Sequence, residues 1–150
     1  MKRYTDFFII NKSLIETASS KFNFASLICI INFGETIMAT LNLLYLVCND
    51  TQEWPRDELY MKVDDRQVWS KGTGTFESGV GVGDTPGIYK SIPMTGTSDT
   101  IRLYEDDTWP NGDEFLGAKT VYASQAGSGL QEAYFTREGA NYTLYYTVTA

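Results

Sequence analysis

Histidine is absent from all 150 residues, and cysteine occurs only twice. Because histidine is the commonest general base and the commonest zinc ligand, its absence disfavours hydrolase triads and zinc sites. The two cysteines fall far short of a disulfide framework, and Cys48 stands in an apolar run where a buried free thiol is expected. The composition leaves the compartment open, with the cytoplasm slightly favoured, and we predict no catalytic residues.

Basic residues are also few, and the acidic excess is unevenly distributed. The chain has a net charge of −7, while residues 38–150 alone carry 8 basic and 16 acidic side chains, a charge of −8. This excess opposes the phosphate contacts on which nucleic-acid binding depends, and no basic stripe offsets it. We therefore expect cations rather than nucleic acid as partners.

A long hydrophobic run is missing as well. The most apolar stretch of the first 37 residues is Phe24–Ile31, and Asn32 and Glu35 interrupt it well short of the roughly 20 residues that span a membrane. A polar stretch at 11–23 separates it from the basic N-terminus, which is not the pattern of a signal peptide. We favour the hypothesis that translation starts at Met38, and the alternative is an N-terminal extension, amphipathic or partly disordered.

Residues 38–150 have the pattern of short strands joined by turns. Aromatic residues make up 14% of the chain, which also contains 13 glycines, and residues 142–149 alternate apolar and polar positions. The predicted strands are Leu41–Cys48, Leu59–Val63, Gln67–Ser70, Gly87–Met94, Thr100–Glu105, Phe115–Ala123, Leu130–Arg137 and Tyr142–Thr149. The pattern predicts an all-β fold, an antiparallel eight-stranded sandwich, in one domain at 38–150. We interpret the glycine-rich run at 79–83 as a flexible loop, because no helix follows it.

Alternating strand directions would place the odd-numbered connections at one end of such a sandwich and the even-numbered connections at the other. The odd end would then collect twelve acids: Asp50, Glu53, Asp57, Glu58, Glu77, Asp84, Glu105, Asp106, Asp107, Asp113, Glu114 and Glu138. The even end would hold only Asp64, Asp65 and Asp99. Crowded carboxylates repel one another unless a cation neutralises them, and Ca²⁺ takes six to eight oxygen ligands from flexible loops. The alternative is that these acids serve turns and solubility.

Two of these acidic segments resemble the calcium-binding loops of the C2 domain family. They are Asp50 with the run at 57–63, Asp-Glu-Leu-Tyr-Met-Lys-Val, and the run at 101–107, Ile-Arg-Leu-Tyr-Glu-Asp-Asp, with Asp-Glu-Phe-Leu-Gly at 113–117. The resemblance covers roughly residues 41–121 and implies a Greek-key sandwich with Ca²⁺ as cofactor. It implies the following ligands: Asp50, Asp57 or Glu58, the pair Glu105 and Asp107, and Asp113 or Glu114. Glu105 departs from the family's usual Asp, and the Pro after the Asp is absent.

Both acidic loops also carry Trp-Pro just before their carboxylates, at Trp54 and Trp109. Such apolar tips beside a cation suit a lipid interface or a sugar ring, whereas each Trp could instead fold back and cap the sandwich. The leading hypothesis is a non-catalytic calcium-binding module that contacts a protein partner or a membrane surface through its acidic end. The alternatives are a structural or protein-interaction sandwich that binds no specific metal and a calcium-dependent carbohydrate-binding module.

Overall fold

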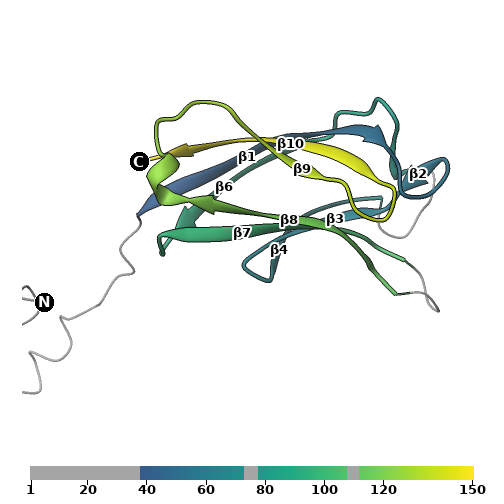
Figure 1. Ribbon diagram of the computed structural model, residues 1–150, viewed down its shortest axis with the longest axis horizontal. Coiled ribbons are helices and arrows are strands. Elements are labelled where there is room, and N and C mark those ends of the chain that lie inside the picture. The colour runs from purple at the N-terminus through teal and green to yellow at the C-terminus, as the bar shows by residue number, and fades with distance from the viewer. Residues whose placement is uncertain (1–37, 73–77, 108–111) are drawn as a thin grey trace, which may run out of the picture. The chain divides into compact units, whose positions relative to one another are not determined.

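The computed structural model describes residues 38–72, 78–107 and 112–150, and within them the chain is almost entirely β-structure (Figure 1). The strands are β1 (Ala39–Asp50), β2 (Arg56–Asp57), β3 (Leu59–Val63), β4 (Arg66–Lys71), β5 (Val80–Gly81), β6 (Gly87–Met94), β7 (Ser98–Glu105), β8 (Glu114–Tyr122), β9 (Gln131–Phe135) and β10 (Asn141–Thr149), with one 3-10 turn, η2 (Ala123–Gln125), after β8. All eight predicted strands are present, and the prediction of an all-β sandwich is confirmed.

The strands form two four-stranded antiparallel sheets, with the orders β6-β1-β10-β9 and β4-β3-β7-β8. Figure 1 shows the sheets as two layers, with β8 and β9 on adjoining edges. A backbone hydrogen bond of 3.1 Å, from Arg137 N–H to the Leu116 carbonyl, joins the layers there. The prediction for residues 79–83 was wrong in part, because Val80 and Gly81 pair with Asp57 and Arg56 as β5 and β2. Strands of two residues are too short to leave a period in the sequence.

The core lies between the sheets and follows the alternation of each strand. In β10, Tyr142, Leu144, Tyr146 and Val148 are buried, because period-2 geometry points them to the same face. In β1 the register shifts between Leu43 and Tyr45, so that Leu46 and Cys48 enter the core while Tyr45 stacks on Tyr145, with ring centroids 4.7 Å apart. Cys48 is a free, buried cysteine, as predicted.

A two-residue turn at the even end shows how local chemistry sets the register of β3 and β4. Asp64 and Asp65 both have positive φ, 46° and 65°, as the turn that matches strand twist requires, and Asp tolerates this conformation better than most side chains. Asp64 Oδ1 also accepts the Thr100 N–H at 2.8 Å, which ties the turn to β7. The two strands predicted at 59–63 and 67–70 thus pair as a hairpin.

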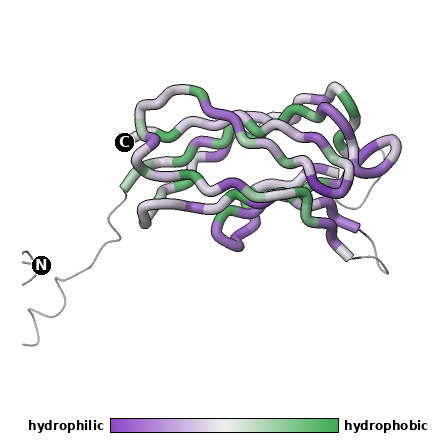
Figure 2. Tube along the Cα trace, in the orientation of Figure 1, coloured by the Kyte–Doolittle hydropathy of each residue, from purple (hydrophilic) through white to green (hydrophobic). Residues whose placement is uncertain are grey.

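The connections that were predicted to share the odd end do gather at one end of the sandwich. The Asp106 N–H donates to the Glu58 carbonyl at 2.6 Å, and β2 pairs with β5, so three of the loops touch through their backbones. Figure 2 shows hydrophilic residues concentrated in the loops at the end away from the C-terminus. At the even end, Ala123 N–H bonds Thr97 O and Gly127 N–H bonds Val148 O.

The predictions for residues 1–37, for Glu77 and for Trp109 lie outside the described residues. No helix in the described part of the chain is long and apolar enough to cross a membrane.

Candidate metal site

Three carboxylates meet at the odd end of the sandwich: Glu53, Glu105 and Asp107. Each offers one oxygen, and these oxygens all lie within 4.8 Å of one another. Glu105 is the last residue of β7 and is fully buried, Asp107 is half-buried two residues later, and Glu53 is exposed in the loop after β1. Two carboxylates at i and i+2 of an extended chain point to the same side, which explains why Glu105 and Asp107 converge. The cluster is therefore closed on the side of Glu105 and open on the side of Glu53.

Glu105 is the deepest member of the cluster. Its Oε1 accepts the Glu58 N–H at 3.2 Å, and its Oε2 has no hydrogen-bond donor in the described part of the chain. Burial raises the pKa of Glu105 to about 8; the Glu58 N–H opposes the shift, and the charges of Asp107, Glu53 and Asp57 add to it. A buried acceptor without a donor costs about 1–3 kcal/mol, and more when it is charged. A cation beside Oε2 would offset the repulsion among the carboxylates and would give Oε2 the contact that it lacks.

Two more buried oxygens near this cluster lack donors among the described residues: Gln52 Oε1 and Glu114 Oε2. Gln52 precedes Glu53 in the loop, and Glu114 is the register partner of Glu105 across β7 and β8. The pKa of Glu114 is raised by burial first and then by the charge of Asp107. In folded proteins most buried polar atoms are paired, so buried oxygens without a donor call for a cation or a water.

Oxygen ligands of this kind fit a hard cation. Carboxylate and amide oxygens are what Ca²⁺ takes, and a mixture of buried and exposed ligands on loops suits its flexible coordination. The residues that would hold the ion are Glu53, Glu105 and Asp107, with Gln52 and Glu114 adjacent.

The structure uses Asp57 differently from these residues. Its side chain is fully buried, and it accepts hydrogen bonds from the Gln52 N–H (2.8 Å), the Glu53 N–H (2.8 Å) and the Tyr142 hydroxyl (2.5 Å). It lies in β2 and pairs with Val80 of β5. Both oxygens are therefore engaged from inside the fold.

The remaining predicted ligands surround the cluster without joining it. Asp50 is exposed and accepts the Thr51 N–H at 3.1 Å, while Asp113 is exposed and accepts the Tyr60 hydroxyl at 2.6 Å. Glu58 is half-buried, and its pKa is raised by burial first and then by the charge of Glu53. Of the seven acids predicted as ligands, Glu105 and Asp107 are brought within ligand distance of one another.

Glu53 was predicted only as one of the odd-end acids and not as a ligand. Its place depends on how the chain turns between Asp50 and Arg56, which no period in the sequence encodes. The nearest sequence signal is its position directly before Trp54. Trp54 is 90% exposed and precedes Pro55 through a cis peptide bond, so it does not cap the core.

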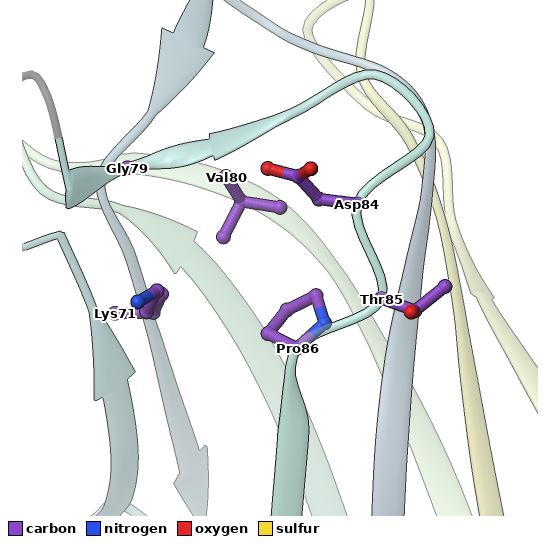
Figure 3. A pocket seen from close by; sticks show the side chains of 6 residues that line it. All are labelled: Lys71, Gly79, Val80, Asp84, Thr85 and Pro86. Carbon is purple, nitrogen blue, oxygen red and sulfur yellow. The ribbon is translucent and has the colours of Figure 1, made fainter.

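A separate cavity of about 220 Å³ lies between β4, β5 and the chain leading into β6 (Figure 3). It is lined by Lys71, Gly79, Val80, Asp84, Thr85 and Pro86. Asp84 accepts the Gly81 N–H at 2.9 Å and the Arg56 guanidinium at 2.9 Å, and these contacts lower its pKa. Because its acid is already paired, this cavity is a poor candidate for binding a cation.

Two solved structures align with most of this chain at low sequence identity. One, described as the structure of a C2 domain, aligns with a TM-score of 0.48 at 15% identity over 75% of this chain and 99% of that chain. Another, a human GIVD cytosolic phospholipase A2 in complex with methyl gamma-linolenyl fluorophosphonate inhibitor and terbium chloride, aligns with a TM-score of 0.39 at 10% identity over 74% of this chain and 17% of that chain. No family model matches the chain, and no curated protein matches it.

Proposed function

We propose that this chain is a non-catalytic calcium-binding module that contacts a membrane surface or a protein partner through its acidic loop end. The observation that carries the proposal is Glu105. This fully buried carboxylate has no donor to its Oε2 in the described residues, and one of its oxygens lies within 4.8 Å of oxygens of Glu53 and Asp107. A solvated acidic surface gives no reason to bury a carboxylate of this kind.

The donor set favours calcium over other metals. The chain has no histidine, and Cys48 is buried in the core, so a zinc site has neither of its usual ligands in this cluster. Magnesium binds through one or two carboxylates in a strict octahedron, whereas calcium accepts more carboxylates and irregular geometry. Three carboxylates, with Gln52 and Glu114 next to them, suit calcium best.

Contact with a surface is supported by the place of Trp54. It directly follows the ligand candidate Glu53 and leaves 90% of its side chain in water. A Trp that is not used in the core and stands beside a charged site is typical of residues that enter an interface. Calcium would also reduce the negative charge of this end, and an anionic surface could then approach it with less repulsion.

The proposal is tested by thermal unfolding of the full chain with calcium, with magnesium at the same concentration, and with excess chelator. A ligand that binds only the native state stabilises it by about 2.7 kcal/mol at a hundred times its dissociation constant. We expect the melting temperature to rise by several degrees with calcium and much less with magnesium. Glu105→Gln should remove the rise, whereas Glu132→Gln, an exposed change on β9, should keep it. Equal shifts with both ions, or no shift with either, would overturn the proposal.

A further inference from the structure

Asp57 holds the backbone of the loop that carries Glu53. Its Oδ2 accepts the Gln52 N–H and its Oδ1 accepts the Glu53 N–H, each at 2.8 Å. Two successive N–H groups that point at one anion form a concave backbone site for it. One of the two groups is the N–H of Glu53 itself, so the carboxylate of Asp57 holds the backbone that carries the Glu53 side chain.

Asp57 is in turn held by a side chain of β10. The Tyr142 hydroxyl donates to Asp57 Oδ2 at 2.5 Å, and both side chains are fully buried. Tyr142 is near the start of β10, which pairs with β1 and β9 in the centre of its sheet. A chain of contacts therefore runs from the rigid sheet through Tyr142 and Asp57 to the loop at 51–55.

The hydrogen-bond count separates Asp57 from Glu105, although both carboxylates are fully buried. Asp57 has three donors distributed over its two oxygens, whereas Glu105 has a single donor on Oε1 and none on Oε2 in the described residues. A carboxylate with three charge-assisted hydrogen bonds is satisfied and offers little to an incoming ion.

We propose that Asp57 is a positioning residue, which orders the loop so that Glu53 completes the cation site with Glu105 and Asp107, and that it is not itself a ligand. This inference rests on the proposed function. An ordered loop matters because a ligand on a loose loop must lose its backbone freedom when the ion binds, which weakens binding. Asp57, one of the two residues that the C2 resemblance implies as the second ligand, thus supports the loop, and Glu53 supplies the ligand oxygen.

The test is a double-mutant cycle in calcium affinity, measured by titration calorimetry on the full chain. Glu53→Gln and Asp57→Asn should each weaken binding about tenfold or more, since each removes the contribution of Glu53. If Asp57 acts only through Glu53, adding Asp57→Asn to Glu53→Gln should weaken binding by no more than about threefold. A further loss of tenfold or more in the double variant would mean that Asp57 is a ligand, and it would overturn the inference.

Tyr142→Phe provides a second arm in which the charge of Asp57 remains. It should weaken calcium binding severalfold, and this loss should also vanish in the Glu53→Gln background. Tyr146→Phe is the matched control, because Tyr146 is equally buried four residues further along β10, and it should leave affinity unchanged. Unchanged affinity in Tyr142→Phe would overturn the inference, and this arm decides the matter if Asp57→Asn does not fold.

Amide hydrogen exchange distinguishes failure of this inference from failure of the proposed function. In the calcium-free wild type, the Gln52 and Glu53 amides should exchange slowly, and Asp57→Asn should make them exchange at least tenfold faster. Fast exchange at both amides in the wild type would overturn the positioning role while leaving calcium binding in place. Absence of any calcium binding by the wild type would overturn the proposed function and the inference together.

Discussion

The two ends of the sandwich both carry acids, but they use them differently. At the even end, Asp64 Oδ1 accepts a backbone N–H, Asp65 pairs with Arg102 at 3.0 Å, and the buried Asp99 lies beside Asp64. At the odd end, Asp57 accepts backbone N–H groups and the Tyr142 hydroxyl, and Asp84 accepts a backbone N–H and the Arg56 guanidinium. Glu105 and Glu114, in contrast, each keep a buried oxygen with no donor in the described residues.

The comparison shows that the number of acids at an end does not by itself indicate a cation site. Asp50, Asp57, Asp84 and Asp113 accept hydrogen bonds from the backbone or from neighbouring side chains, which is ordinary structural work in turns and loops. What distinguishes this end is the two buried carboxylate oxygens, Glu105 Oε2 and Glu114 Oε2, which need a partner that the described side chains and backbone do not supply. The predictions below test that difference, beginning with the largest expected effect.

The pH dependence of stability should differ between calcium-free and calcium-loaded protein. The pKa of Glu105 is raised in the folded state from its ordinary value near 4.5 to about 8. The folded state therefore binds this proton more tightly than the unfolded state, so stability is highest below the unfolded pKa and falls as pH rises toward 8. We expect a loss on the order of 3 kcal/mol between pH 5 and pH 8 in chelator, measured by denaturant unfolding.

Glu105→Gln is the control for that experiment, because it keeps the shape and removes the titrating group. Its stability should vary much less over the same pH range. A wild type whose unfolding midpoint in chelator is flat from pH 5 to pH 8 would contradict the raised pKa of the buried Glu105.

Calcium affinity should respond to changes at one end only. Asp107→Asn keeps an oxygen and removes a charge from the cluster, so we expect a loss of about ten- to a hundredfold, equivalent to roughly 1.4–2.7 kcal/mol. Asp64→Asn and Asp99→Asn at the even end should leave the affinity unchanged. Calorimetric titration of the three variants measures this, and equal losses at both ends would remove the distinction between them.

The exposed Trp54 should matter for contact and not for folding. Trp54→Ala should change the free energy of unfolding by no more than about 0.5 kcal/mol, because the side chain is 90% exposed. It should weaken calcium-dependent sedimentation with anionic vesicles about tenfold. Tyr122→Ala, an exposed aromatic at the even end, is the control and should sediment like the wild type. A loss of several kcal/mol in Trp54→Ala would show a core role instead.

The smallest effect is expected for the ion pair at the even end. Asp65 is largely exposed, and exposed pairs contribute little after screening by salt. Asp65→Asn should therefore change the unfolding free energy by less than about 1 kcal/mol, with or without calcium. A calcium-dependent change in this variant would mean that the even end also binds the ion.

Much of the fold was predictable because it depends on short-range patterns. The alternation in residues 142–149 identified β10 and its buried face, and turn residues bounded the hairpin of β3 and β4. For the eight predicted strands, every end lies within two residues of the observed end. The predictions missed β2 and β5, which owe their pairing to the approach of two loops, and the shift in β1 that turns Tyr45 out of the core.

The sequence by itself determined that acids gather at one end, because alternation of strand direction sorts the connections regardless of how the sheets pack. The resemblance to C2 loops also paired Glu105 with Asp107, and the two lie close together in the structure because residues two apart in an extended chain share a side. Only the tertiary structure decided between Glu53 and Asp57. Asp57 accepts a hydrogen bond from Tyr142, 85 residues away in sequence, and no local pattern encodes this contact between β2 and β10.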